Sequence, residues 1–178
     1  MEPTDSRRQS HWAELLALAA LVVLLAWSFK RPPTPPIAGG MPLPEIMAEG
    51  WLNTQHVPSR DSLLGKTVVI DFWFLDCPPC RAAIPELAQL YRQYHPLGVE
   101  FVGLTVDMAA DVPRLQEFID QTKGFDWPVG YGSHPTHEIL GVSGYPTLIA
   151  FDSTGSAIWS SHTTDGLAAT LDRALASE

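Results

Sequence analysis

The chain has 178 residues, of which 46% are hydrophobic, and a formal net charge of −9 at pH 7. This length predicts one globular domain with appended segments. Residues 1–31 carry four basic and three acidic side chains, so the remaining residues carry a net charge of −10. Such an acidic domain argues against binding to nucleic acid and against lying flat on an anionic membrane surface.

The N-terminal part of the chain divides into three segments. Residues 1–11 are polar, and residues 12–29 are apolar except for Glu14 and Ser28. Eighteen helical residues span about 27 Å, close to the thickness of a hydrocarbon core, so residues 12–29 predict a transmembrane signal anchor. A signal peptide cleaved near Ala26-Trp27-Ser28 is the alternative. Basic residues lie on both sides, so charge does not decide the orientation. Residues 30–44 predict a Pro/Gly-rich linker to a domain at residues 45–178.

The start of the domain contains two short apolar runs, Ile46-Met47-Ala48 and Trp51-Leu52, on either side of Glu49-Gly50. A glycine between two short apolar runs favours a chain reversal, so this pattern predicts a short hairpin. Leu63-Leu64-Gly65-Lys66 then predicts a tight turn that leads the chain into the next strand.

An apolar, β-favouring run from Val68 to Phe74 leads into Cys77-Pro78-Pro79-Cys80. The run is too short to cross a membrane and predicts a buried parallel strand. Proline is accepted in the first turn of a helix, where its missing N–H would lack a partner, so the motif predicts a helix start. Two cysteines three residues apart there lie about 5–6 Å from each other on one face, close enough to join or separate with little backbone movement.

These two cysteines are the only ones in the chain, and their expected environments differ. Cys77 would lie at the helix N-terminus, where unpaired N–H groups and the helix dipole favour a thiolate. Cys80 would be more shielded and would resolve a mixed disulfide formed at Cys77. The motif closes too short a loop to stabilise the fold, so it predicts a site of dithiol–disulfide exchange.

The rest of the domain alternates between helical and strand patterns. We expect a helix to about Tyr94 with a kink at Pro85, a strand at 99–106, a helix at 112–122, a short strand at 127–129, a short helix at 137–140, a hairpin of strands 146–151 and 157–160 joined by a turn at 152–155, and an amphipathic helix marked by Leu167, Leu171 and Leu175. In this order, strands connected through helices are followed by two strands connected as a hairpin. This combination predicts an α/β sandwich with a mixed sheet.

The central stretch resembles the thioredoxin superfamily. Cys77-Pro78-Pro79-Cys80-Arg81, with Ile84-Pro85-Glu86-Leu87 downstream, is most similar to the membrane-anchored TlpA/ResA-type thiol–disulfide oxidoreductases. A bare C-x-x-C is a weak signal, whereas one between a buried strand and a helix, with a matching proline far downstream, is specific. The resemblance covers roughly residues 42–176. It implies a thioredoxin-like three-layer sandwich, in which helices flank the central sheet.

The matching proline is Pro146, within Gly144-Tyr145-Pro146-Thr147. The resemblance implies that the Tyr145–Pro146 bond is cis and lies against the C-x-x-C, so that the backbone just before the proline can pair with an incoming client. Cis bonds occur almost only before proline and usually mark a constraint. An ordinary trans proline at a strand start is the alternative.

Two further side chains belong to the predicted site. Asp71 falls inside the apolar strand, where burial should raise the pKa of its carboxyl. The resemblance implies that Asp71 relays protons to Cys80; a side chain turned toward solvent is the alternative. Thioredoxins have a lysine near such an acid, whereas this chain offers Gly103 on the neighbouring strand. The resemblance also places Trp73 beside the disulfide, although a plain core role accounts for it nearly as well.

Two positions depart from the family pattern. Asp76 stands where many relatives have an aromatic residue, and its charge should raise the pKa of the Cys77 thiol. A less stabilised thiolate favours the disulfide and makes the pair a stronger reductant. A helix-capping role for Asp76 is the alternative, and both can hold. Ala83 stands where ResA-type proteins have an acid, so acid–base duty should fall to Asp71 or to water.

These observations favour a membrane-tethered thiol–disulfide oxidoreductase that needs no cofactor. The resemblance implies a catalytic domain on the periplasmic side of a bacterial cytoplasmic membrane, protein thiol or disulfide clients such as apocytochrome c, and a thiol protein as electron donor. We expect a monomer, and the sequence leaves open whether the protein reduces, oxidises or isomerises.

Two other functions compete with this interpretation. A peroxiredoxin is rejected because Phe74 stands where its threonine would be. A copper- or zinc-binding chaperone of the same fold, using Cys77 and Cys80, is the alternative, although such proteins usually space their cysteines one residue further apart. His134 and His137 could complete such a metal site, but their polar, proline-bounded segment favours surface histidines, and we predict no metal.

Overall fold

The structure is a computed structural model, and it describes residues 39–177. Its elements in chain order, with η for short 3₁₀ helices, are β1 (Gly50–Leu52), α2 (Arg60–Leu63), β2 (Val68–Trp73), α3 (Pro78–Tyr94), η1 (His95–Leu97), β3 (Glu100–Thr105), η2 (Ala109–Asp111), α4 (Val112–Gln121), β4 (Val129–Tyr131), α5 (His134–Ile139), β5 (Thr147–Phe151), β6 (Ala157–Ser161) and α6 (Leu167–Leu175). The predicted segments at 1–11 and 12–29, and most of the predicted linker, lie outside the described residues. Within residues 39–177, no helix combines the length and the apolar character that a membrane crossing requires.

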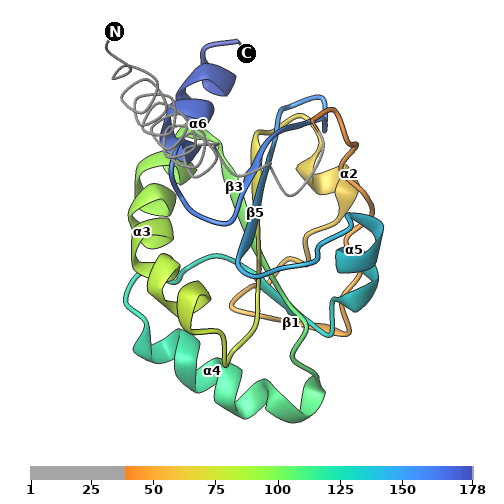
Figure 1. Ribbon diagram of the computed structural model, residues 1–178, viewed down its shortest axis with the longest axis vertical. Coiled ribbons are helices and arrows are strands. Elements are labelled where there is room, and N and C mark those ends of the chain that lie inside the picture. Colours follow the sequence, from red (N-terminus) through yellow and green to blue (C-terminus); the bar gives the residue numbers. More distant parts are fainter. Residues whose placement is uncertain (1–38, 178) are drawn as a thin grey trace, which may run out of the picture. The chain divides into compact units, whose positions relative to one another are not determined.

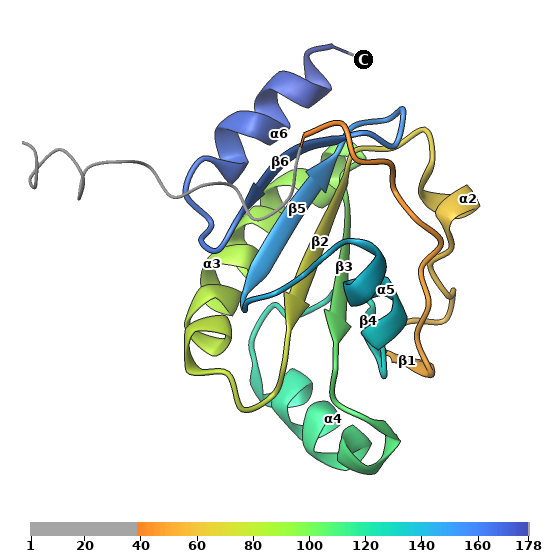
Figure 2. The same cartoon turned by 45° about the vertical axis from the view of Figure 1, so that its right-hand side comes forward.

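The strands of this part of the chain form one six-stranded sheet in the order β1-β4-β3-β2-β5-β6. β2 pairs in parallel with β3, and β3 with β4, whereas the pairs β2–β5, β5–β6 and β1–β4 are antiparallel. Figures 1 and 2 show α3 and α6 on one face of the sheet, α2 and α5 on the other, and α4 beyond the carboxyl ends of β2 and β3. The predicted α/β sandwich with a mixed central sheet is therefore confirmed.

β2 lies inside the sheet and is buried along its whole length. Successive side chains of a strand point to opposite faces of the sheet. Val69 and Trp73 accordingly join the core layer beneath α3, which contains both cysteines, while Ile70 and Phe72 join the layer on the α5 side. This alternation places Asp71, which lies between Val69 and Trp73, on the same face of the sheet as the cysteines.

The far end of α3 is fixed to the last helix. Tyr94 donates a hydrogen bond from its hydroxyl to Oδ1 of Asp172 in α6 at 2.7 Å. Burial, together with this bond and the Asp172 charge, raises the pKa of Tyr94 to about 12, so the hydroxyl stays protonated at neutral pH. α3 is thereby tied to α6 at the end opposite to the cysteines.

The predicted hairpin at residues 46–52 is wrong. Gly50–Leu52 is a strand, but its partner is β4, with Trp51 opposite Gly130. Met47 is instead held to α5, because its N–H donates to Thr136 Oγ1 at 2.8 Å and its carbonyl accepts from the same hydroxyl at 2.9 Å. Ile46 is buried in the core layer on the α5 side. Of the first apolar run only Ile46 is buried, and the second run forms a strand with a partner other than the one predicted.

Several boundaries also differ from the prediction. β4 begins at Val129, after Pro128, because proline has no N–H to give to a strand pair. α5 begins at His134 and not at His137. The short helix α2 was not predicted; Ser59 and Ser62 cap its start reciprocally. The predicted turn at Leu63-Leu64-Gly65-Lys66 is present, with the Lys66 N–H bonded to the Leu63 carbonyl and Gly65 at a positive φ of 82°.

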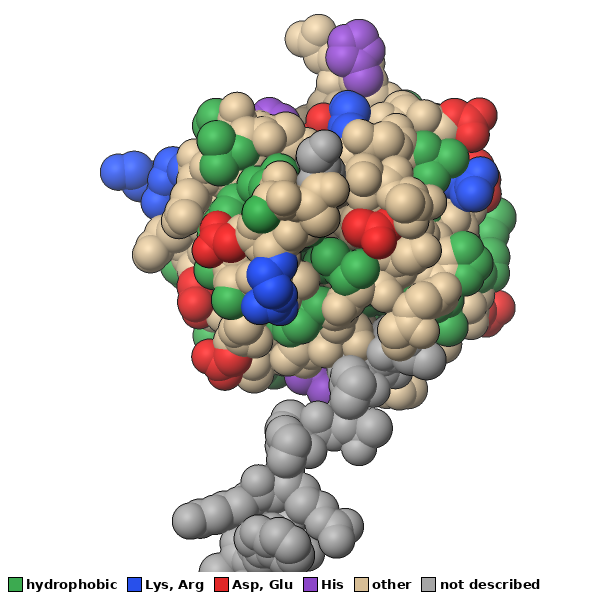
Figure 3. Space-filling model, turned by 90° about the horizontal axis from the view of Figure 1, so that it is seen from above, with side chains coloured by type: hydrophobic (Ala, Val, Ile, Leu, Met, Phe, Trp, Pro, Cys, Tyr) green, Lys and Arg blue, Asp and Glu red, His purple; other side chains and the backbone are tan. Residues whose placement is uncertain are grey.

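The surface carries side chains of mixed character. On the face seen in Figure 3, acidic, basic and hydrophobic groups are interspersed and no broad basic area is visible. This face gives no support to binding of a polyanion, in keeping with the acidic composition.

Candidate active site

The two cysteines lie where β2 passes into α3. Cys77 is the N-cap of the helix, and its sulfur accepts the N–H of Cys80 at 3.2 Å. Pro78 and Pro79 occupy the first helical positions, as the sequence predicts. Cys77 and Cys80 form a disulfide with their Cα atoms 5.3 Å apart. The cysteines are 2% and 1% exposed, so in the oxidised state Cys77 is buried almost as deeply as Cys80.

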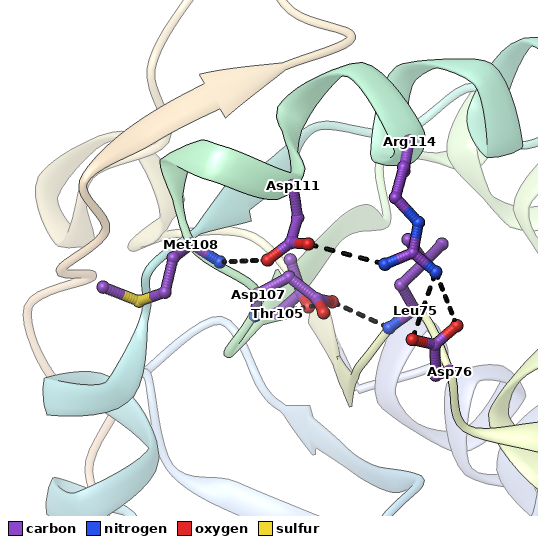
Figure 4. Close-up of polar contacts among 7 residues, drawn as sticks. All are labelled: Leu75, Asp76, Thr105, Asp107, Met108, Asp111 and Arg114. Carbon is purple, nitrogen blue, oxygen red and sulfur yellow. Dashed lines mark hydrogen bonds and ion pairs between the residues drawn. The ribbon is translucent and has the colours of Figure 1, made fainter.

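The loop before Cys77 is fixed by the end of β3. The N–H of Leu75 donates to Oδ2 of Asp107 at 2.7 Å, and the hydroxyl of Thr105 donates to the same oxygen. Figure 4 shows Asp107 and Thr105 reaching the loop from the neighbouring strand. The sequence predicted only that Asp107 ends a strand. The position of Asp107 at the carboxyl end of a strand next to the site is the sequence signal that could have suggested a contact with the site.

Asp76, directly before Cys77, forms an ion pair with Arg114 of α4. Nη2 of Arg114 lies 2.8 and 3.1 Å from the two carboxylate oxygens, and Nη1 lies 3.5 Å from Asp111 Oδ1 (Figure 4). The pairing with Asp76 raises the pKa of the Arg114 guanidinium. Asp76 is not the helix cap, because Cys77 has that position, so the capping alternative is wrong. Arg114 offsets part of the negative charge that Asp76 brings to Cys77.

A pocket of about 170 Å³ opens beside this ion pair, and Asp76, Arg81 and Arg114 are among its lining residues. The Arg81 guanidinium lies over the Phe118 ring, 4.7 Å from its centroid, which is a cation–π arrangement. The sequence carried no signal for this pocket, because its arginines belong to two different helices. The pocket adjoins the start of α3 and gives the surface beside Cys77 both signs of charge.

The Tyr145–Pro146 peptide bond is cis, as predicted. The ring of Tyr145 packs edge-on against Phe74, with centroids 5.3 Å apart, so the loop before β5 contacts the loop before Cys77. Neither side chain of this contact is fully exposed. Two loops that are far apart in the sequence therefore meet at the disulfide.

His162, at the end of β6, holds the proline loop in place. Its Nδ1 lies 2.7 Å from the Pro146 carbonyl oxygen, so this nitrogen carries the hydrogen and donates it. The Thr147 hydroxyl donates to the Gly144 carbonyl at 2.8 Å. A Cβ at Gly144 would lie 3.3 Å from Cε1 of His162, so the glycine lets the imidazole approach the loop closely. Sequence reasoning did not find His162, because nothing in its own segment marks it.

Asp71 is 4% exposed, and no hydrogen bond satisfies its Oδ2 atom. Burial raises the pKa of its carboxyl from 3.8 to about 7. Its register neighbours are Gly103 on β3 and Leu148 on β5, both without a charge. The predicted burial and raised pKa are confirmed, the solvent-facing alternative is wrong, and the relay of protons to Cys80 stays a prediction.

Trp73 is fully buried in the core layer that contains both cysteines. Its ring lies 5.7 Å from that of Phe118 and 5.6 Å from that of Phe125, so it is embedded among aromatic side chains of the neighbouring segment. The structure thus gives Trp73 a core position within the layer that lines the disulfide, which agrees with both of its predicted roles.

The prediction of two surface histidines is wrong for His137, which is 4% exposed. Its ring packs edge-on against Phe72, with centroids 4.7 Å apart, and Nδ1 lies 2.9 Å from the Ser133 carbonyl oxygen. Burial lowers the pKa of its imidazole. The segment forms a short helix whose inner face closes the core, and this covers His137. Within residues 39–177, no group of three or more His, Cys, Asp or Glu side chains could hold a metal ion.

Comparison with known proteins agrees with this geometry. The family model described as Redoxin matches residues 38–171. The thiol-disulfide oxidoreductase ResA of Halalkalibacterium halodurans is 26% identical over 159 residues, which cover 85% of this chain and 86% of ResA. A solved thiol-disulfide isomerase from Corynebacterium glutamicum is 26% identical, with a TM-score of 0.65, over 75% of this chain and 96% of that chain. A secreted Mycobacterium tuberculosis disulfide oxidoreductase, described as homologous to E. coli DsbE, is 22% identical, with a TM-score of 0.55, over 65% of this chain and 87% of its own.

The chain belongs to the Redoxin family. Its fold is thioredoxin-like, and it is a thiol–disulfide oxidoreductase of the ResA type whose redox-active disulfide joins Cys77 and Cys80. The resemblance inferred from the C-x-x-C motif is thus confirmed.

The bond from His162 to the Pro146 carbonyl predicts a defect that depends on the size of the client. We expect His162→Ala to slow exchange with a protein disulfide about fivefold, because one hydrogen bond that orders the loop before β5, where the resemblance implies that a client backbone pairs, is worth roughly 1 kcal/mol. Dithiothreitol has no peptide backbone that could pair with this loop, so the rate of its exchange should not change. Stopped-flow rates with both reagents check this, with His134→Ala as the exposed-histidine control. An equal loss with both reagents would contradict a role in docking.

The raised pKa of Asp71 predicts a pH-dependent gain in stability on its removal. The pKa of about 7 in the folded chain lies above the ordinary 3.8, so the folded state holds this proton more tightly. This tighter binding of the proton stabilises the folded state below about pH 4, and the stabilisation is lost as the pH rises through 7. Asp71→Asn should therefore raise the free energy of unfolding by up to about 4 kcal/mol at pH 8 and change it little at pH 4.

Urea denaturation of the full-length chain at both pH values measures this difference. Asp61→Asn, at an exposed position of α2, is the matched control and should show no such difference between the two pH values. A gain of the same size at both pH values would mean that the ionisation of Asp71 is not the cause.

Proposed function

We propose that this protein is a disulfide reductase that acts on extracytoplasmic proteins, for example in cytochrome c maturation. The observation that carries the proposal is the Cys77–Cys80 disulfide at the start of α3, in one core layer with a carboxyl whose pKa is about 7. A group with such a pKa takes up or gives up a proton near neutral pH. The exchange reaction needs such a proton transfer when Cys80 becomes a thiolate.

The reaction runs in two displacements at sulfur. In the reduced protein, the Cys77 thiolate attacks one sulfur of the client disulfide; a bond forms between these two sulfurs, and the other client sulfur leaves as a thiolate. Asp71 then takes the proton of Cys80, and the Cys80 thiolate attacks the Cys77 sulfur. The second client thiolate leaves, the Cys77–Cys80 disulfide forms, and the client has gained two electrons. A thiol protein reduces the disulfide again.

The charges around the start of α3 support the reducing direction. Strong oxidants of this kind stabilise their reduced form. Here the helix dipole favours the thiolate at Cys77, but the carboxylate of Asp76 lies directly before it, and Asp71 lies on the same face of the sheet. Arg114 offsets Asp76 only in part, because both side chains are exposed to solvent that screens the pair. The balance opposes a strongly stabilised thiolate.

The proposal extends to location and partners. Residues 12–29 would anchor the protein in the bacterial cytoplasmic membrane, residues 30–44 would act as a linker, and residues 45–178 would work as a monomeric domain on the periplasmic side. Similarity to ResA and to a secreted disulfide oxidoreductase supports this location. The partners would be protein disulfide clients and a thiol electron donor, without a cofactor, metal or nucleic acid.

The reduction potential of the Cys77–Cys80 pair tests the direction of electron flow. We expect a value near or below about −250 mV, close to that of thioredoxin, when the full-length protein is equilibrated with dithiothreitol or glutathione buffers and its thiols are alkylated. A value near about −120 mV, typical of a strong oxidant, would overturn the reductase. A pair that no redox buffer titrates would exclude exchange altogether.

The ion pair between Asp76 and Arg114 predicts shifts of opposite sign in this potential. Arg114→Gln leaves the Asp76 charge uncompensated, destabilises the Cys77 thiolate and should lower the potential by about 10–20 mV. Asp76→Asn leaves Arg114 uncompensated and should raise it by a similar amount. The double variant should lie between the two, and Arg173→Gln on α6 is the control for loss of a positive charge elsewhere. Shifts of the same sign in both single variants would contradict the argument.

A further inference from the structure

Arg81, in the first turn of α3, has no anionic partner in the described part of the chain. None of the ion pairs of residues 39–177 includes it, and no hydrogen bond there uses its guanidinium. The guanidinium lies instead over the Phe118 ring, 4.7 Å from the centroid. A contact with a ring engages no carbonyl or carboxylate, so the N–H donors in the guanidinium plane remain available to an outside acceptor. Phe118 thus holds an unpaired donor group in place.

Arg81 lies one helical turn from Cys77. Its N–H donates to the Cys77 carbonyl at 3.1 Å, and residues four apart lie on the same face of a helix. With Asp76 it lines the pocket of about 170 Å³, and with Asp76 and Pro78 it lines a second pocket of about 390 Å³. Asp76 and Pro78 are the residues on either side of Cys77, so the space next to Arg81 opens beside the residue that carries the attacking sulfur.

The other charged groups of the smaller pocket already have partners. Nη2 of Arg114 lies 2.8 and 3.1 Å from the two carboxylate oxygens of Asp76, and Figure 4 shows the two side chains directed at each other. Glu117 Oε1 accepts a hydrogen bond from Gln121 Nε2 at 3.0 Å. Among the charged residues that line this pocket, Arg81 is therefore the one whose side chain has no hydrogen-bond or ion-pair partner within residues 39–177.

We infer that Arg81 binds a carboxylate of the protein whose cysteine is joined to Cys77, and that it thereby favours clients with an Asp or Glu close to the reacting cysteine. A guanidinium can donate two parallel N–H···O hydrogen bonds to one carboxylate, a geometry that a neutral side chain does not match. An extended chain covers about 3.3 Å per residue. An acidic residue one to three positions from the client cysteine can therefore reach a side chain one helical turn from Cys77.

The preference for an acid follows from the charges in the pocket. A basic client residue would meet the positive charges of Arg81 and Arg114, and Asp76 is already paired. An acidic residue gains Arg81 as a partner, and the exposed carboxylate of Glu117 opposes its binding in part. The inference rests on the proposed exchange with a protein client. It does not depend on the direction of electron flow, because a mixed disulfide forms at Cys77 in either direction.

The experiment compares matched peptides in their reaction with the reduced full-length protein. Each peptide has one cysteine in a mixed disulfide with 2-thiopyridine, and either Glu or Gln within three positions of it. The Cys77 thiolate attacks the peptide sulfur, and thiopyridine leaves with the bonding electrons and is measured by absorbance. After division by the rate with dithiothreitol, we expect the Glu peptide to react about fivefold faster than the Gln peptide for at least one position at low salt. Equal rates at every position would overturn the proposal.

Substitutions identify the group that binds the acid. Arg81→Gln should abolish the preference for Glu, and Arg81→Glu should replace it with a preference for a Lys peptide. Glu117→Gln removes the opposing carboxylate and should increase the preference for Glu about twofold. Arg92→Gln, at an exposed position three turns further along α3, is the control and should keep the preference. An effect of Arg81 on the Cys77 thiolate would change the rates of both peptides equally, so it cancels in their ratio.

The outcomes separate this pocket from the proposed reductase. A preference for Glu that survives Arg81→Gln would overturn the role of Arg81. If that variant does not fold, a salt titration of the unchanged protein provides the test, because the preference should disappear as salt rises to about 0.5 M and a constant preference would contradict an ion pair. A preference for Glu together with a potential near about −120 mV would support the pocket and refute the reductase. A reducing potential with equal rates for both peptides would do the reverse.

Discussion

The register of β2 between β3 and β5 is the constraint on which the site depends. Because this strand is buried on both faces, every side chain is assigned to one layer or the other, and a shift by one residue would exchange the layers. In the observed register, Asp71 faces the cysteine layer, opposite Gly103, and the chain leaves the sheet at the point where α3 can begin with Cys77. This one alignment sets the positions of Asp71, of the disulfide and of the loop contacts beside it.

Two carboxyl groups near the disulfide act in different surroundings. Asp76 is exposed and paired with Arg114, so its effect on Cys77 is moderated by solvent and by the opposite charge. Asp71 is buried with no charged partner, so its ionisation is controlled by burial alone. In the proposed mechanism, Asp76 would adjust the stability of the Cys77 thiolate, and Asp71 would take up the proton of Cys80. β2 carries Asp71 and the loop after it carries Asp76, so proton transfer and thiolate stability would depend on different carboxyl groups.

The parts of the site that could be predicted are those carried by local sequence. Three local features carry these predictions: the apolar run of β2, the prolines of the C-x-x-C and the proline at 146. Each acts on its own few residues, and the disulfide, the helix start and the cis bond are where the sequence predicts them. Asp71 was predictable for the same reason, since a carboxyl inside an apolar strand is buried wherever the strand is.

The remaining features depend on contacts between distant segments. Arg114 meets Asp76 across 38 positions, and His162 meets Pro146 across 16, so no local pattern marks either pair. The hairpin at 46–52 was wrong because the backbone of Met47 bonds to Thr136 of α5 and Trp51-Leu52 pairs with the distant strand β4, and the local sequence marks neither partner. His137 was assigned to the surface for the converse reason: a polar, proline-bounded segment can still turn one face inward when it forms a short helix.

The burial of the disulfide has a consequence for how the oxidised protein is recycled. With Cys77 only 2% exposed, a reducing partner gains access to its sulfur by displacing part of the covering loops. Reduction of the disulfide therefore depends on movement of these loops. For the reductase proposed above, a partner whose surface fits these loops would therefore supply electrons faster than a thiol protein that does not fit them.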